Sequence, residues 1–296
     1  MAPAVATIGF FDGVHRGHRF LLDYVIEEAE NRREKSMVVT FPDSPANVLN
    51  PAATLPLLNT PDEKVRLLHE AGIDIVAMMT FTTQLASFTA EEYMDKVLCR
   101  ELKVDTLVMG YDHRFGKKTN SDAMDYSSIG HLYGIDVIRY SPFKMQTSDS
   151  AVSSSAIRTA LAEGDVSTAN HCLGYNYAME GRVVGGHHVG TSIGFPTANL
   201  LVDTKKLVPA NGVYAVDVTT GDGEKRRGML NIGRRPTLDN GTDRSIEVNI
   251  FGFEGNLYDK SISLSFIKFI RTEQRFESIE QLRQQLIHDR NACINV

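Results

Sequence analysis

The sequence contains few cysteines, and they are spaced too widely to form a thiolate metal pair. Cys99, Cys172 and Cys293 are the only cysteines among the 296 residues, and no two of them form a CxxC motif. An odd number of distant cysteines is typical of a protein from a reducing compartment, whose thiols are structural or incidental. The pattern argues against a small domain held together by disulfides.

Long hydrophobic runs are also missing. A membrane-spanning helix needs roughly 18 consecutive apolar residues, and no stretch of the chain approaches that length. Met1–Phe11 lacks the basic start and the long apolar segment of a secretory signal. We therefore expect a cytoplasmic protein with no membrane partner.

An excess of positive charge is absent as well. The 31 Lys and Arg residues are outnumbered by 37 Asp and Glu residues, which gives a net charge of −6. A protein that coats nucleic acid carries a basic surface, so no nucleic-acid partner is expected. The acidic excess lies in residues 1–172, whereas the remainder is nearly neutral. Together with a length that suits two domains, this asymmetry predicts two different units in one chain.

The first half of the chain alternates buried strands with amphipathic helices. Helical spacing covers residues 18–35, Thr60 and Glu63 form a capping-box pattern, and a further helix is expected over Thr89–Leu102. The expected strands are unbroken apolar runs at Val5–Phe10, Met37–Phe41, Ile73–Met79, Val104–Met109 and Ile135–Arg139. Such runs between helices predict a doubly wound, Rossmann-like α/β domain with a parallel sheet covered on both faces.

The second half changes to short alternating segments separated by Gly, Asp, Asn and Pro. This spacing indicates a small antiparallel barrel or sandwich, and we prefer a β-barrel followed by a C-terminal helix at Ser278–Asp289. The expected strands are Gly181–Val184, Val213–Thr219, Arg227–Asn231, Ser245–Phe251 and Ser261–Phe269. We expect the two domains to cover residues 1–174 and 175–296.

The most informative motif is GFFDGVHRGH at residues 9–18, between the first predicted strand and the first predicted helix. Ligands bind at the carboxyl edge of open α/β sheets, where glycines let the backbone approach closely and a helix start offers unpaired N–H groups. His15 and His18 can donate hydrogen bonds to a triphosphate as negative charge builds on it. A structural turn with surface histidines is the alternative, which this strand-to-helix context disfavours. The other candidate phosphate-binding residues of this loop are Gly9, Phe11, Asp12 and Gly13.

A second candidate phosphate site lies in VSSSAIR at residues 152–158. Ser154 and Ser155 stand where a helix is expected to begin, and Arg158 lies in its first turn. Hydroxyls, helix N–H groups and a guanidinium together bind anions well. By itself such a segment is usually only a helix cap.

These motifs resemble the FAD synthetase module of bacterial bifunctional riboflavin kinase/FMN adenylyltransferases. The similarity rests on GxFDGVHxGH, on GYDHRFGKK at residues 110–118 and on SSxxIR. It implies that His15 and His18 face the α- and β-phosphates of ATP, and that Ser154, Ser155 and Arg158 hold the triphosphate from the opposite side. It also implies that Asp112 and its neighbour Phe115 line the flavin or nucleotide pocket.

A glycine-rich loop opens the second half, with the sequence GGHHVGTSIGFPTANL at residues 185–200. Gly185, Gly190 and Gly194 suit a loop that lies over phosphates. Thr197 and Asn199 offer hard oxygen ligands of the kind that Mg²⁺ accepts beside phosphate oxygens and water. The adjacent His187 and His188 point to opposite faces of an extended chain and have no further ligands nearby, so no zinc is expected.

This half resembles the riboflavin kinase module of the same family. The similarity rests on FPTAN, GVY, NIGRRPT, EVN and LY in this order. It implies that Thr197 and Asn199 contact Mg²⁺ and ATP phosphates, that Asn231 contacts the flavin, and that Glu247 is the catalytic base. For an isolated Glu in a strand, a solvated outer face would be the ordinary interpretation.

Four positions, in three segments, depart from the family pattern. Asp43 and Ser44 stand in a loop where relatives have an imidazole, Thr191 replaces a basic residue, and Asn249 stands where a His often follows the catalytic Glu. These departures bear on rate and affinity more than on reaction type.

The resemblance implies a bifunctional enzyme that phosphorylates riboflavin to FMN and adenylylates FMN to FAD, releasing ADP and pyrophosphate. The expected co-substrate is ATP with Mg²⁺ in both reactions. Two alternatives stay open: a nucleotidyltransferase for another mononucleotide, and a non-catalytic flavin-binding regulator. Association into a homo-oligomer is also left open.

Overall fold

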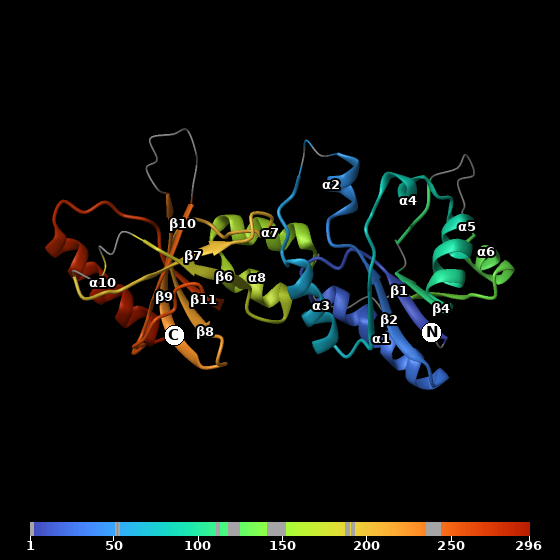
Figure 1. Cartoon of the computed structure of the whole chain (residues 1–296), viewed down its shortest axis with the longest axis horizontal. Helices are drawn as coiled ribbons and strands as arrows, with labels where there is room; N and C mark the ends of the chain where they lie inside the picture. The colour runs from blue at the N-terminus through green and yellow to red at the C-terminus, as the bar shows by residue number, and fades with distance from the viewer. Residues whose placement is uncertain are drawn as a thin grey trace. The chain divides into compact units, whose positions relative to one another are not determined.

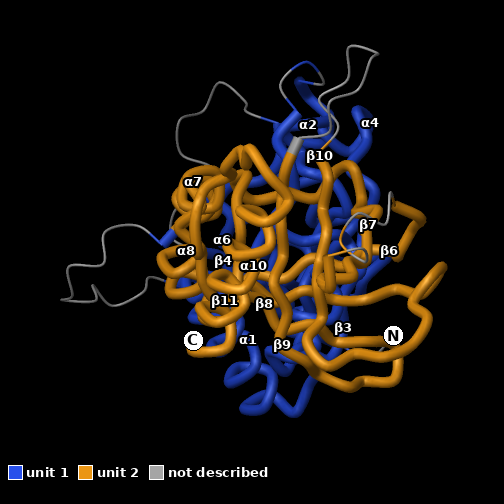
Figure 2. Tube along the Cα trace, turned by 90° about the vertical axis from the view of Figure 1, so that its left-hand side faces the viewer, with its two compact units in different colours: residues 1–152 blue, residues 153–296 orange. Residues whose placement is uncertain are grey.

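The chain forms two compact units, residues 1–152 and residues 153–296 (Figure 2). The structure is a computed structural model that describes residues 3–296 except for 51, 53, 111–112, 118–124, 141–151, 187–189, 191–192 and 235–243. Each unit has a core of its own, so each is described by itself.

The first unit is built on a five-stranded parallel sheet (Figure 1). The strand order is β3-β2-β1-β4-β5, and every pair of neighbours is parallel. The strands are β1 (Ala4–Ile8), β2 (Lys35–Thr40), β3 (Ile75–Met78), β4 (Val104–Gly110) and β5 (Asp136–Tyr140). All five strands predicted from the apolar runs are confirmed. The chain runs from β1 outward to β2 and β3 on one side, and then returns to β4 and β5 on the other side. The junction between β1 and β4 is therefore the switch point of a doubly wound sheet.

Helices cover both faces of this sheet. All five residues of β1 are buried; Ala4, Ala6 and Ile8 share a core cluster with Met94, whereas α1 packs on β1 and β2. The predicted capping box of Thr60 is present at α3. The predicted helix over Thr89–Leu102 begins as an α-helix and continues as the π-helix η2. The helical segments are α1 (Arg16–Arg32), α2 (Pro45–Leu49), α3 (Pro61–Glu70), α4 (Thr83–Ser87), α5 (Ala90–Tyr93), η2 (Met94–Glu101) and α6 (Tyr126–Leu132).

The second unit is a closed antiparallel barrel with the strand order β10-β7-β6-β11-β8-β9. The barrel is confirmed, with one strand that the sequence analysis did not predict. That strand, β7, follows a Gly/Pro-rich loop and is only five residues long, so its alternation is hard to see in the sequence. The barrel strands are β6 (Ala178–Val184), β7 (Ala198–Val202), β8 (Gly212–Thr219), β9 (Lys225–Arg234), β10 (Arg244–Ile250) and β11 (Ser261–Arg271).

Among the described residues of the second unit, three helices accompany the barrel. The C-terminal helix α10 (Ile279–Ile294) packs on β8, β9 and β11, where Cys293 is buried against Val213 and Met229. Helix α7 (Ser154–Glu163) packs on α8 (Val166–Leu173), and α8 packs on β11. The sequence-predicted boundary at 174/175 falls after these two helices, whose contacts group them with the barrel.

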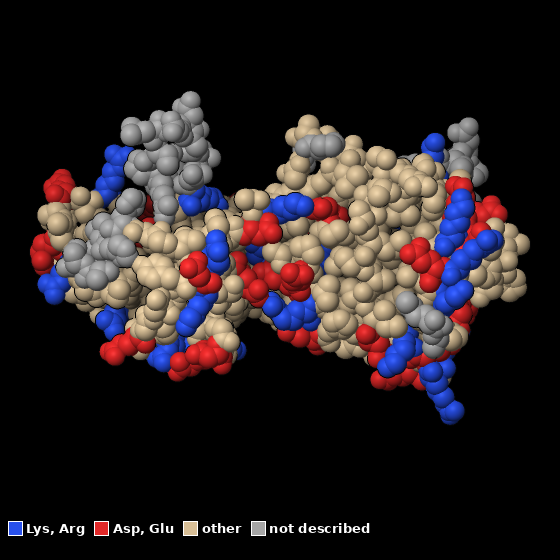
Figure 3. Space-filling view, viewed as in Figure 1, with Lys and Arg blue, Asp and Glu red and all other residues tan. Residues whose placement is uncertain are grey.

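Charged side chains of both signs are interspersed over the face of each unit that Figure 3 draws. A broad uncharged area on the first unit surrounds α2, in keeping with the lack of any charged residue in segments 44–60 and 75–90. Among the residues that the structure describes, no helix is long and apolar enough to cross a membrane.

Candidate active sites

The loop that follows β1 lies at the switch point of the first unit. Strand β1 ends at Ile8, and α1 begins at Arg16, so residues 9–15 form the turn between them. The amide of Gly9 still donates to the carbonyl of Val39 at 3.0 Å, which keeps the start of the loop beside the end of β2. The motif therefore lies where open α/β sheets bind ligands.

Three residues with positive φ values give this turn its tight shape. Gly13 has φ 86°, which favours glycine, but Phe11 at 49° and the β-branched Val14 at 36° also have positive φ values. Such values cost non-glycine residues on the order of 1–3 kcal/mol each, so the surroundings must fix them. A Cβ on Gly9 would lie 2.8 Å from the Phe11 ring. Gly9 is thus required for close packing, and Gly13 for its backbone conformation.

His15 and His18 stack on each other at the start of α1. Their ring centroids are 3.6 Å apart with an interplanar angle of 14°. His15 is the N-cap of α1, and its Nδ1 accepts a hydrogen bond from the backbone N–H of His18 at 3.3 Å. Because Nδ1 is an acceptor, the hydrogen of the neutral ring is on Nε2, which can donate to a ligand.

Burial keeps both imidazoles neutral. It lowers the pKa of His15 to about 4, and it lowers the pKa of His18 well below its usual value, with further lowering by the charges of His15 and Lys64. The Nδ1 atom of His18 is buried and has no hydrogen-bond partner among the residues that the structure describes. Two stacked imidazolium rings would repel each other, so neutral N–H donors are the state that this geometry favours.

Contacts from the segment before α3 and from α3 itself hold the loop. The Asp12 carboxylate, which is 2% exposed, accepts hydrogen bonds from the backbone N–H groups of Leu58 and Asn59 at 3.0 and 3.2 Å. The buried Lys64 of α3 donates to the carbonyl of Phe10. The sequence analysis did not single out Lys64; the only signal was a lysine one position after the capping-box Glu63, in an otherwise ordinary helix.

The second sequence motif forms the start of α7. The Oγ of Ser153 accepts from the N–H of Ala156 at 3.2 Å, so Ser153 is the N-cap and α7 begins at Ser154. Ser155 is exposed and Arg158 is half-buried in the first turn and a half. Both therefore lie near the positive end of the helix dipole.

Of the two candidate flavin-binding residues of the first unit, Asp112 lies outside the described residues. Phe115 packs against Tyr93 and Tyr126, with ring centroids 5.1 and 4.8 Å apart. The Tyr126 hydroxyl accepts from the Phe115 amide and donates to the Phe115 carbonyl. These contacts fix the Phe115 backbone at the edge of the core.

Three predicted residues of the second unit form one row across adjacent strands. Asn199 of β7 is paired with Glu247 of β10, which is paired in turn with Asn231 of β9. Directly opposite residues of an antiparallel pair point to the same face, about 5 Å apart. The hydroxyl of Thr197 donates to the Glu247 carboxylate at 3.4 Å, so it joins the end of this row. The sequence analysis singled out all four residues, but not this alignment.

The glycine-rich loop lies against Thr197 and Asn199. A Cβ on Gly186 would collide with the Asn199 amide group, and a Cβ on Gly190 would collide with the Phe195 carbonyl and lie 3.5 Å from the Thr197 hydroxyl. Gly194 has a positive φ of 83°, which favours glycine. A Cβ on Gly185 would meet no atom of the described residues within 4 Å. The loop can approach these side chains because it carries glycine there. Residues 187–189 and 191–192, which include His187, His188 and Thr191, lie outside the described residues.

Asn249 fixes the segment that carries Thr197. Its side-chain Nδ2 donates to the Pro196 carbonyl at 2.6 Å, and the side chain is 6% exposed. Asn249 stands two positions after Glu247 on β10, on the same face of the strand. The sequence analysis noted this residue only as a departure from the family; the structure gives it a definite contact.

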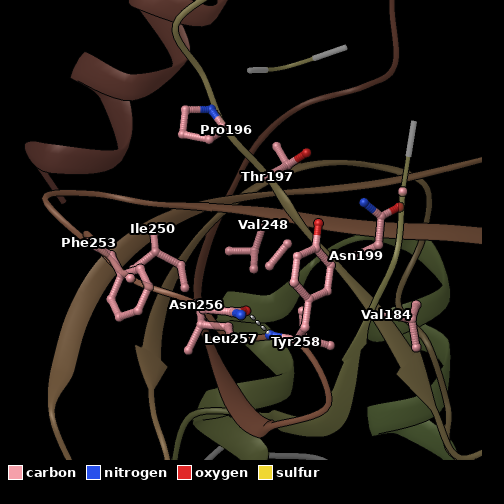
Figure 4. Close-up of a pocket in the computed structure, with 14 residues that line it drawn as sticks. Val184, Pro196, Thr197, Asn199, Val248, Ile250, Phe253, Asn256, Leu257 and Tyr258 are labelled. Carbon is pink, nitrogen blue, oxygen red and sulfur yellow. Dashed lines mark hydrogen bonds between the residues drawn. The ribbon is translucent and has the colours of Figure 1, made fainter. Parts of the chain in front are cut away.

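A cavity of about 340 Å³ opens beside Thr197 and Asn199. Figure 4 shows these two polar side chains on one side of it and Phe253, Asn256 and Leu257 on the other. Val183, Val248 and Ile250 add apolar surface. A cavity lined by both polar and apolar groups suits a ligand that has a phosphate end and a flat ring.

Comparison with known proteins gives two family matches. The model of the FAD synthetase family matches residues 1–156, and the model of the riboflavin kinase family matches residues 173–296. The bifunctional riboflavin kinase/FMN adenylyltransferase of Escherichia coli strain K12 is 38% identical over 286 residues, which cover 96% of this chain and 90% of the relative. That of Bacillus subtilis strain 168 is 34% identical over 302 residues, which cover 99% and 92%.

A solved structure has the same architecture. The crystal structure of a macrolide-efflux protein from Streptococcus pneumoniae matches with a TM-score of 0.88 and 31% sequence identity, and the match covers 100% of this chain and 95% of that one. The two proteins therefore share both units.

The fold and the motifs define a chain of two joined transferase modules. The chain belongs to the bifunctional riboflavin kinase/FMN adenylyltransferase family.

Proposed function

We propose that this chain catalyses two successive reactions of flavin cofactor synthesis. The second unit transfers the γ-phosphoryl group of ATP to riboflavin, which yields FMN and ADP. The first unit transfers the adenylyl group of ATP to FMN, which yields FAD and pyrophosphate. The observation that carries the proposal is the aligned row of Asn199, Glu247 and Asn231 beside Thr197, in a chain whose first unit stacks two neutral imidazoles at its sheet edge.

In the second unit, Glu247 is the catalytic base. Its carboxylate accepts the proton of the ribityl 5′-hydroxyl as that oxygen bonds to the γ-phosphorus and the bond to the β-phosphate oxygen breaks. Asn231, its partner on β9, is proposed to contact the flavin on the same face. The cavity beside Thr197 is proposed to take the adenine ring of ATP against its apolar side chains.

The residues at this site fit Mg²⁺. Thr197 and Asn199 supply a hydroxyl and an amide oxygen near the Glu247 carboxylate, and Mg²⁺ prefers such oxygen ligands together with phosphate oxygens and water. Mg²⁺ bound there would neutralise charge on the phosphate oxygens of ATP. Gly185, Gly190 and Gly194 are proposed to lie along those phosphates.

In the first unit, His15 and His18 donate hydrogen bonds to the phosphates of ATP. A terminal phosphate oxygen of FMN bonds to the α-phosphorus while the bond to the leaving pyrophosphate breaks, without a covalent enzyme intermediate. Neutral donors in a buried setting stabilise charge that develops on the phosphate oxygens. The backbone at Gly9, Phe11 and Gly13 is proposed to approach the phosphates, and Asp12 is proposed to hold the loop through Leu58 and Asn59.

Four further assignments belong to the proposal. Ser154, Ser155 and Arg158 at the start of α7 bind ATP phosphates, and Asp112 and Phe115 line the flavin pocket. The functional boundary lies near residue 174, since the second family match begins at residue 173. The chain acts in the cytoplasm.

The test is an assay of flavin products. Purified protein with riboflavin, ATP and Mg²⁺ should yield FMN and then FAD on a chromatogram. Failure to form either flavin would overturn the proposal. Transfer of adenylate to another phosphate compound but not to FMN would favour a different nucleotidyltransferase, and tight flavin binding without consumption of ATP would favour a regulator.

A further inference from the structure

Lys64 is a fully buried lysine beside the loop of the first unit, with an exposed fraction of 0%. Its Nζ donates to the carbonyl of Phe10 at 2.9 Å and to the carbonyl of Phe41 at 2.8 Å. It also lies 3.9 Å from the centroid of the Phe10 ring. One ammonium group thus contacts two backbone carbonyls from different parts of the chain.

The two carbonyl groups lie just beyond the carboxyl ends of two neighbouring strands. Phe10 follows β1 and Phe41 follows β2, and these strands are paired in parallel. The Phe10 carbonyl also accepts from the hydroxyl of Thr40 at 3.0 Å. Immediately after Phe10 comes the turn in which Phe11 and Val14 have positive φ values. Lys64 therefore fixes the backbone where the strained turn begins.

A lysine at this position is costly for stability alone. Burial lowers the pKa of Lys64 to about 8, although the charges of Asp12 and Asp43 oppose this lowering. The neighbouring positions of α3 carry buried leucines, Leu67 and Leu68, which need no compensation. A well-packed apolar side chain is often as stabilising as a buried charged one. The hydrogen bonds that Lys64 makes therefore suggest a role beyond packing.

We propose that Lys64 is a positioning residue for adenylyl transfer: by bridging the carbonyls of Phe10 and Phe41 it holds the turn that orients His15 and His18. This inference rests on the proposed function of the first unit. Lys64 does not touch the substrate in this role; it acts through the backbone. Its loss should slow the chemical step more than it weakens ATP binding.

The experiment compares three variants of the full chain. Lys64→Met keeps an unbranched side chain only one atom shorter but has no donors, and Lys64→Gln keeps two amide donors without the charge. Lys35→Met is the matched control, because Lys35 lies at the opposite end of β2 and pairs with Asp74 in an exposed salt bridge. For each protein, kcat and the KM for ATP are measured in FAD formation from FMN, and hydrogen exchange of the β1 and β4 peptides reports whether the first unit is folded.

Lys64→Met should lower kcat by about tenfold or more, with a change in KM for ATP below about threefold, since a small misplacement of catalytic groups costs rate rather than affinity. Lys64→Gln should recover part of this loss, and Lys35→Met should match the wild type. FMN formation from riboflavin should be unchanged in all three.

Three results would overturn the inference. The first is a Lys64→Met protein with kcat within twofold of the wild type. The second is a loss that lies entirely in KM. The third is loss of hydrogen-exchange protection in both Lys64 variants, which would make the residue purely structural. If only Lys64→Met unfolds, the same kcat and KM criteria are applied to Lys64→Gln. A wild-type protein that forms no FAD from FMN would instead refute the proposed function, before any variant is compared.

Discussion

His15 and His18 illustrate how burial prepares a side chain for its chemistry. The two rings are in contact, and burial keeps both of them uncharged at neutral pH. The hydrogen bond from the His18 amide leaves Nε2 of His15 as the donor. A cation at this position would be attracted to phosphate in the ground state, whereas a neutral donor gains strength as charge develops in the transition state.

This neutrality predicts a pH dependence of stability. The folded pKa of His15 is about 4, below its ordinary value of 6.5, so the unfolded chain binds more protons between these values. The corresponding stability is fully present above pH 6.5 and is lost as the pH falls toward 4, by on the order of 3 kcal/mol for this group. The free energy of unfolding of the first unit, measured with denaturant at several pH values and monitored by hydrogen exchange, should show this slope. His15→Gln should reduce this slope and leave the part that is due to His18, and an unchanged slope in that variant would contradict the account.

Asn249 gives a second prediction at the residue scale. Its amide donates to the Pro196 carbonyl and so fixes the segment that carries Thr197. Asn249→Ala removes this donor, and FMN formation should fall by about tenfold because the ligands of the phosphate site are displaced. Asn249→His restores an N–H donor and should retain most of the rate. FAD formation from added FMN serves as the internal control; equal rates of FMN formation in Asn249→Ala and wild type would refute the assignment.

At the scale of the element, the glycine-rich loop after β6 depends on close approach. A Cβ on Gly186 would collide with the Asn199 amide, which is short and cannot move aside without leaving the row with Glu247. We therefore expect Gly186→Ala to slow FMN formation by about tenfold through displacement of Asn199.

The matched control for this loop is Gly221→Ala. Gly221 lies in the turn between β8 and β9, where an added Cβ would meet no atom within 4 Å. Steady-state rates of FMN formation should thus separate the two variants. Equal rates would show that the loop tolerates a side chain at position 186 and would contradict the geometry.

The elements themselves differ in how far the sequence predicts them. The apolar runs of the parallel sheet are buried on both faces, so their pattern is strong, and all five strands are where it places them. Strand β7 is short and begins within FPTAN, whose polar residues serve the candidate site rather than the alternation of a strand. The π-helix η2 cannot be told from an α-helix by spacing alone, because both bury one apolar stripe.

The residues of the candidate sites also differ in how far the sequence predicts them. The residue types of Thr197 and Asn199 make both of them candidate ligands in the sequence, whereas Glu247 is singled out only by the family resemblance. Lys64 and Asn249 act through backbone carbonyls that only the fold brings near them. Residues of this second kind cannot be found from the spacing of side chains in one sequence.

At the scale of the whole molecule, the central feature is that each unit has its own core and its own candidate catalytic residues. The sheet unit carries the stacked imidazoles, and the barrel carries the row around Glu247. Substitutions at the imidazoles and at Glu247 should therefore act separately, because residues that share no partners contribute additively.

The most direct test of this claim is a chromatogram of flavins from two single variants, His18→Ala and Glu247→Gln. Given riboflavin, ATP and Mg²⁺, His18→Ala should accumulate FMN without FAD, whereas Glu247→Gln should leave riboflavin unchanged. Given FMN instead, Glu247→Gln should form FAD at about the wild-type rate. Loss of both activities in either folded variant would contradict the assignment of one reaction to each unit.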